Sequence, residues 1–138
     1  MTPHLFCLVS QRDDLSLLPA LADAGVDGFQ VRDKSLATAA LVALTRAVVA
    51  AVRPAGAVVV VNDRLDVALA AGADGVHLGA DDLAVADARR LAPGLVIGAT
   101  CRSRAEVVTA AGAGADYAGF GPVFASADRK STRLNSSH

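Results

Sequence analysis

The sequence has no excess of charge of one sign, and this shortage excludes whole classes of partner. Its 13 lysine and arginine residues stand against 14 acidic residues, so the net charge is -1. Such a surface has no general attraction for nucleic acid or for an anionic membrane. We therefore expect neither partner, and we expect any anion site to be local.

Cysteine is scarce as well. Cys7 and Cys101 lie far apart and belong to no CxxC or Cys/His ligand spacing, which indicates neither a disulfide framework nor a zinc site. The chain does not begin with a basic segment, an apolar stretch and a cleavage site, and its longest apolar runs fall short of a membrane span. We expect a soluble, cytoplasmic protein.

What the sequence does have is an alternation of two patterns. Its 138 residues, 53% of them hydrophobic, suffice for one domain with a sizeable core. Short runs rich in β-branched residues alternate with longer Ala- and Leu-rich segments that have helical spacing. The expected strands are 5–10, 28–33, 57–62, 75–78, 96–100 and 117–124, and the expected helices are 15–24, 36–52, 65–71, 82–91 and 104–113.

A similar corner recurs three times, where a helix ends and a strand begins. It reads Ala-Gly-Val-Asp-Gly at 24–28, Ala-Gly-Ala-Asp-Gly at 71–75 and Gly-Ala-Asp-Tyr at 114–117. Glycine ends the helix, and the aspartate side chain is expected to close the tight turn. Parallel strands follow from this repeat, but a barrel and an open doubly wound sheet explain it equally well.

The last eleven residues break the pattern. Residues 128–138 are polar, have no periodicity, and resemble the translation of a sequencing-library adapter. We therefore expect a domain over residues 1–127 and a non-native, disordered tail over 128–138. A genuine disordered C-terminus is the alternative.

The strongest local signal is a basic strand end. Strand alternation places Gln30, Arg32 and Lys34 on one face, so three donors point the same way. At the mouth of a barrel such groups suit a pyrophosphate, because arginine forms paired hydrogen bonds and lysine supplies a compact charge. The alternative is a solvated edge strand with ordinary surface charges.

Acidic residues follow the next two strands. The apolar strand at 58–61 ends in Asn62 and Asp63, and the following strand is succeeded by Gly79 and Asp82. Neighbouring parallel strands bring their carboxyl ends together, so Asp63 and Asp82 are expected to share one magnesium ion. The alternative is that each aspartate only caps a helix.

The later strands carry weaker signals. Thr100 and Ser126 end the fifth and sixth units, where Thr100 is expected to touch substrate and Ser126 to donate to a phosphate, although such residues also simply make loops. Ser103 is expected to cap the fifth helix. His77 is interpreted as a packed, hydrogen-bonded strand residue without a role, and Cys101 as a small packed thiol.

In chain order the motifs are Gln30-x-Arg32-x-Lys34, Asn62-Asp63, Gly75-Val76-His77-Leu78-Gly79 with Asp82, Gly98-x-Thr100 and Gly121-Pro122-x-Phe124. This series resembles thiamine phosphate synthase over residues 4–127. The resemblance implies an α/β fold, a partial TIM (β/α)8 barrel with about six strands and five helices. It also implies that the last two strands are missing. The sheet then has two unpaired edges, at which self-association is possible.

The resemblance implies a transferase that joins hydroxymethylpyrimidine diphosphate to a thiazole phosphate, with pyrophosphate leaving before the thiazole nitrogen attacks. Its partners are then small phosphorylated molecules. The roles implied are catalytic for Arg32 and Lys34, substrate-binding for Gln30, Arg32, Lys34, Asn62, Thr100 and Ser126, and magnesium-binding for Asp63 and Asp82.

Two positions depart from the family pattern. Arg102 stands where the family has histidine and Ala80 where it has glutamine, so substrate contacts there are expected to differ. A thiazole tautomerase-like isomerase is the alternative enzyme, but its family has histidine at the position of Pro122 and lacks Asp82. An inactive truncated fragment is the alternative without catalysis.

Overall fold

The computed structural model of the protein describes residues 2–120, which form one parallel β-sheet with helices against it. The strands are β1 (Phe6–Val9), β2 (Gly28–Val31), β3 (Val58–Asn62), β4 (Gly75–Leu78), β5 (Val96–Cys101) and β6 (Tyr117–Phe120). The helices are α1 (Leu18–Asp23), α2 (Thr38–Val52), α3 (Leu65–Ala71), α4 (Val85–Leu91) and α5 (Arg104–Ala113). Short 3-10 turns, Leu15–Leu17 and Arg53–Ala55, precede α1 and follow α2.

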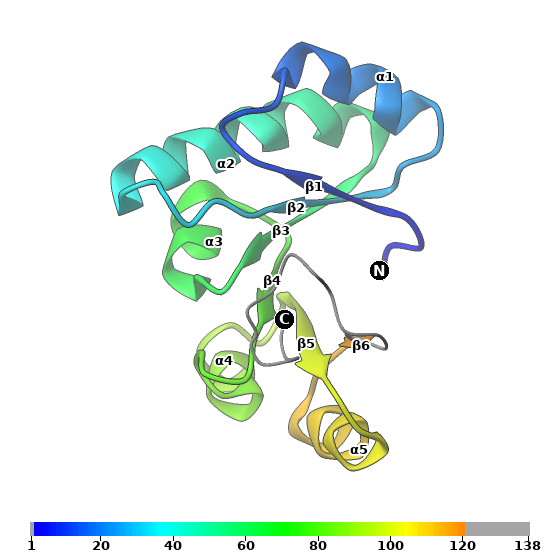
Figure 1. Ribbon diagram of the computed structural model, residues 1–138, viewed down its shortest axis with the longest axis vertical. Helices are drawn as coiled ribbons and strands as arrows, with labels where there is room; N and C mark the ends of the chain where they lie inside the picture. Colours follow the sequence, from blue (N-terminus) through cyan, green and yellow to red (C-terminus); the bar gives the residue numbers. More distant parts are fainter. Residues whose placement is uncertain (1, 121–138) are drawn as a thin grey trace, which may run out of the picture.

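The strands pair in sequential order, β1 to β6, and every pairing is parallel. Figure 1 shows the five helices in an arc along the outer side of the curved sheet. A doubly wound sheet reverses its strand order and has helices on both faces. The structure is therefore a half-barrel, and the predicted α/β class with six strands and five helices is confirmed.

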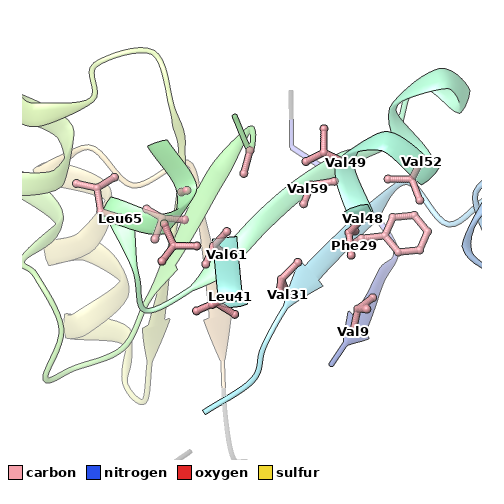
Figure 2. Close-up of a cluster of buried hydrophobic side chains, with 14 of the residues drawn as sticks. Val9, Phe29, Val31, Leu41, Val48, Val49, Val52, Val59, Val61 and Leu65 are labelled. Atoms are coloured by element: carbon pink, nitrogen blue, oxygen red, sulfur yellow. The ribbon is translucent and has the colours of Figure 1, made fainter. Parts of the chain in front are cut away.

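The core lies between the sheet and the helices. Figure 2 shows side chains of β2 and β3, among them Phe29 and Val59, facing Val48 and Val52 of α2. All four are fully buried. Burial of a side chain of this size contributes about 1.5–3 kcal/mol, so this layer holds the strands in register.

One expectation about apolar segments is wrong. The segment 38–55, formed by α2 and the turn after it, is long and apolar enough by length and composition to cross a membrane. Five of its side chains are buried, and α2 packs on α1, α3 and the sheet. Its place against the sheet accounts for the apolar side chains of this buried face, which makes up 28% of the segment.

The repeated corner works differently from the prediction. Gly25, Gly72 and Gly114 have positive φ angles, as helix-ending glycines should. The aspartates, however, reach across to the start of a neighbouring strand. Asp27 accepts from the amide of Leu5 at 2.7 Å, and Asp74 and Asp116 accept from those of Val59 and Ile97, both at 2.8 Å. Each carboxylate thus links adjacent strands at their amino ends.

Several predicted boundaries shift. The second strand ends at Val31 and the second helix begins at Thr38, each two residues inside the predicted limit. The fourth helix begins at Val85 and not at residue 82. The end of the predicted sixth strand and the tail 128–138 lie outside the described residues.

Candidate active site

A cavity of about 570 Å³ lies at the carboxyl ends of the strands. Seven of the eight predicted site residues line it, namely Gln30, Arg32, Lys34, Asn62, Asp63, Asp82 and Thr100. The eighth, Ser126, lies outside the described residues. The cavity gathers these groups because the carboxyl ends of parallel strands share one rim.

The basic face belongs to β2 and the segment after it. β2 lies between β1 and β3, so the alternative of a solvated edge strand is wrong. Gln30 is on the strand, whereas Arg32 and Lys34 follow it and are exposed at the rim. Asp33, on the opposite side, accepts from the amide of Gln11 at 3.0 Å and holds the loop. The three donors of the β2 end therefore face the cavity together.

Asn62 and Asp63 end β3. Asn62 is 7% exposed, and its side-chain amide makes no hydrogen bond to another residue within 2–120. A buried amide without a protein partner is costly unless a ligand or water satisfies it. Asp63 adopts a left-handed backbone, with φ of 69°, and its amide donates to the carbonyl of His77 at 2.8 Å. This turn directs the Asp63 carboxylate into the cavity.

Asp82 belongs to the loop between β4 and α4. Its Oδ2 accepts from the amide of Gly79 at 2.7 Å, so the carboxylate folds back onto the strand end. For this reason α4 begins only at Val85, and Ala84 and Arg64 occupy the N-cap positions of α4 and α3. Neither predicted metal residue is a helix cap, and that alternative is wrong for both.

The two carboxylates meet above Gly79. A Cβ atom placed on that glycine would lie 3.0 Å from Asp82 Oδ2 and 3.9 Å from Asp63 Oδ1. Lys34 Nζ donates to Asp63 Oδ2 at 2.9 Å from the other side. Glycine therefore leaves the space that both acidic side chains share with one ammonium group.

Their pKa values move in opposite directions. Burial acts to raise the pKa of Asp63, but hydrogen bonds from Asp82 and Lys34 and the charges of Lys34 and Arg32 outweigh it, so this pKa lies below the ordinary value. Burial and the neighbouring Asp63 raise the pKa of Asp82, although the Gly79 amide opposes this. Two carboxylates held this close repel each other when both are charged, so a bound cation would stabilise the charged pair.

His77, Thr100 and Tyr117 form a hydrogen-bonded row beside the carboxylates. His77 Nε2 lies 2.9 Å from Thr100 Oγ1, and His77 Nδ1 lies 3.1 Å from the Tyr117 hydroxyl. Burial lowers the pKa of His77, despite the opposing charge of Asp63, and raises the pKa of Tyr117 to about 12. The prediction of a packed, hydrogen-bonded His77 is confirmed, but sequence reasoning missed its contact with the site.

The fifth unit contributes two further features. Ser103 caps α5 as predicted, accepting from the Glu106 amide at 3.1 Å, while Glu106 accepts from the Arg102 amide at 2.8 Å. Arg102 and Ala80 both line the cavity, so the two departures from the family pattern fall within the site. Cys101 is 1% exposed, and the prediction of a packed thiol is confirmed.

Comparison with known proteins identifies the family. Residues 2–136 match the family described as thiamine monophosphate synthase, which is nearly the whole sequence. The chain belongs to the thiamine monophosphate synthase family. A relative from Chlorobium luteolum, a thiamine-phosphate synthase, is 44% identical over 89% of this chain and 60% of its own length.

Further members agree. The bifunctional protein ThiM/ThiE of Symbiobacterium thermophilum is 50% identical over 87% of this chain and 25% of its own length. A solved structure, thiamine phosphate pyrophosphorylase from Pyrococcus furiosus, is 33% identical with a TM-score of 0.79, covering 88% of this chain and 61% of that one. The chain thus spans at most about 60% of the length of these relatives.

The residues present fit the magnesium ion that this family implies. Within residues 2–120 no cluster of three or more histidine, cysteine or acidic residues could hold a metal by itself. The pair Asp63 and Asp82 supplies hard oxygen ligands beside an open cavity. Magnesium is commonly held by one or two carboxylates, with waters and substrate phosphates completing its shell.

Proposed function

We propose that the complete protein is a thiamine phosphate synthase, which joins hydroxymethylpyrimidine diphosphate to a thiazole phosphate and releases pyrophosphate. One observation carries the proposal. The basic groups of the β2 end and the acidic groups after β3 and β4 line a single cavity. A diphosphate with a divalent cation needs both signs of charge within reach of one another.

In this proposal the chain's own residues bind the diphosphate. Arg32 and Lys34 supply positive charge at the rim, and Gln30 and Asn62 supply amide donors deeper in the cavity. Lys34 shares its ammonium between Asp63 and the diphosphate, which places it between the acidic pair and the anion. Arg32 and Lys34 act as catalytic residues because they contact the oxygens of the departing pyrophosphate.

The reaction needs little proton transfer from the protein. The bond between the pyrimidine methylene carbon and the diphosphate oxygen breaks, and pyrophosphate leaves with the electron pair. The lone pair of the thiazole nitrogen then forms the new carbon–nitrogen bond. Arg32 and Lys34 stabilise the charge that develops on the leaving group, because they are already in place before the bond breaks.

Magnesium would be held by Asp63 and Asp82 and would neutralise charge on the diphosphate oxygens. The presence of Asp82 beside Asp63 supports the synthase over the tautomerase-like isomerase, whose family lacks this residue. Pro122, the other residue that separates the two families, lies outside the described residues. Location in the cytoplasm is part of the same proposal, and self-association stays a prediction.

The test is magnesium-dependent formation of thiamine phosphate by the complete protein. We expect product and pyrophosphate in equal amounts, and loss of both when magnesium is chelated. Arg32→Ala should lower kcat/KM by about a hundredfold, since it removes a charge from the reacting centre. Arg90→Ala, which removes an exposed arginine paired with Asp87 on α4, is the matched control and should leave turnover unchanged. Absence of product from the complete protein would refute the proposal.

A further inference from the structure

Three side chains on adjacent strands form a continuous row of hydrogen bonds that ends in the cavity. Tyr117 is on β6, His77 on β4 and Thr100 on β5. The hydroxyl of Tyr117 lies 3.1 Å from His77 Nδ1, and His77 Nε2 lies 2.9 Å from Thr100 Oγ1. Of these three, Thr100 and His77 line the cavity, and Tyr117 does not.

Packing fixes the two rings of this row. Gly98 stands between His77 and Tyr117 in the strand register, and a Cβ atom on it would collide with the Tyr117 ring. The Tyr117 ring centroid is 5.6 Å from those of both Phe6 and His77. The Tyr117 ring therefore occupies space that only a glycine leaves, between two other rings.

On the other side, Gly119 fixes His77. A Cβ atom on Gly119 would lie 3.0 Å from His77 Cε1, so the imidazole lies directly against that backbone. Both half-buried rings are therefore restricted by the sheet backbone that they contact at Gly98 and Gly119. The hydrogen bonds of the row are consequently held by the sheet itself.

The tautomer of His77 that is protonated at Nε2 gives the row a direction toward the cavity. The Tyr117 hydroxyl keeps its proton at neutral pH, as tyrosines do, and burial raises its pKa further, to about 12. Within residues 2–120 its hydrogen-bond partner is His77 Nδ1, to which it can donate this proton when Nδ1 carries none. A neutral imidazole that accepts at Nδ1 carries its proton on Nε2 and donates to Thr100 Oγ1. The proton of Thr100 is then left to be donated to another group.

We propose that Tyr117 and His77 are positioning residues that hold the Thr100 hydroxyl as a donor toward an oxygen of the diphosphate. An isolated threonine hydroxyl rotates among several partners and can equally well accept. When His77 Nε2–H donates to Oγ1, Thr100 keeps its own proton for an anion in the cavity. This inference rests on the proposed function, in that it names the diphosphate as the group that Thr100 meets.

The test measures binding of inorganic pyrophosphate, with magnesium, to the complete protein by calorimetry. Thr100→Val should raise Kd about tenfold, because one hydrogen bond to a charged group is lost. Tyr117→Phe keeps the ring over Gly98 but removes the hydroxyl, and should raise Kd about threefold. His77→Gln should bind more tightly than His77→Leu, because its amide can still donate to Thr100.

A double-mutant cycle separates positioning from general damage. In the Thr100→Val background, Tyr117→Phe should have no further effect on Kd. An equal effect in both backgrounds, or none in either, would overturn the inference. So would a protein that does not bind pyrophosphate at all.

The matched control is Thr45→Val on α2. Thr45 is fully buried and its hydroxyl donates to the carbonyl of Leu41 at 2.8 Å, away from the cavity. This variant should lower Tm and leave Kd unchanged; a rise in Kd as large as that of Thr100→Val would also overturn the inference. Since pyrophosphate binding needs no turnover, a positive cycle in a protein that forms no thiamine phosphate refutes only the proposed function.

Discussion

Lys34 Nζ lies 2.9 Å from Asp63 Oδ2 and joins the segment after β2 to the end of β3 across the mouth of the half-barrel. The lysine side chain is 67% exposed. Exposed pairs of this kind contribute about 0–1 kcal/mol to stability, so this pair does little to hold the fold. Its removal therefore tests the chemistry of the cavity more than it tests folding.

Lys34→Met should lower kcat/KM for thiamine phosphate formation by about a hundredfold, because a cation that faces the leaving oxygens is lost. Thermal unfolding should show nearly the same Tm as the unsubstituted protein. Arg64→Met breaks another exposed pair, that with Asp66 at 2.8 Å, and serves as the control. Equal activity losses in the two variants would contradict the assignment.

Asp63→Asn and Asp63→Ala should differ in stability but not in activity. Both remove the carboxylate, so both should abolish magnesium-dependent turnover. Only alanine resists the left-handed backbone at φ of 69°, whereas asparagine adopts it readily. Urea unfolding should therefore find the alanine variant less stable than the asparagine variant by about 1 kcal/mol. Equal unfolding free energies would show that the turn relaxes.

Asp82→Asn should stabilise the protein at neutral pH while weakening magnesium binding. The pKa of Asp82 is raised by burial and by Asp63, so its contribution to stability is full below its unfolded pKa and is lost as pH rises through its folded pKa. Asparagine carries no charge and keeps an oxygen that can accept from Gly79. The Tm of the variant should exceed that of the parent at pH 7, and the difference should shrink as pH falls toward the unfolded pKa. A variant with lower Tm at pH 7 would contradict this sign.

Asp74→Ala should destabilise the fold and leave the site unaffected. Asp74 accepts from the amide of the fully buried Val59 at 2.8 Å and from Arg53 at 3.0 Å, at the amino end of the strands. Leaving that amide without a partner should cost about 1–3 kcal/mol of unfolding free energy. Pyrophosphate affinity at the opposite end should stay the same, and a parallel loss of affinity would show that the two ends are coupled.

Much of the fold follows from local sequence. Hydrophobic periodicity predicts the strands and helices within a few residues, and glycines such as Gly72 predict where helices end. The site was predictable for a related reason, since residues that follow parallel strands meet at one rim whatever the details of packing. Arg32, Asp63 and Thr100 could therefore be assigned to one cavity before any coordinates.

Contacts between residues far apart in the chain are different, because no spacing encodes them. His77 and Tyr117 are 40 residues apart, and they meet only because the register aligns both with Gly98. The alternative of a helix cap at Asp82 was wrong because its carboxylate turns back to Gly79.

The sequence by itself determined the order of strands and helices and the rim on which the polar groups lie, because periodicity and chain direction are local properties. Only the tertiary structure decided which groups touch. The stagger between strands, and the space that is free where a glycine lacks a side chain, are properties of the assembled sheet. They bring Asp63 to Asp82 and Tyr117 to His77.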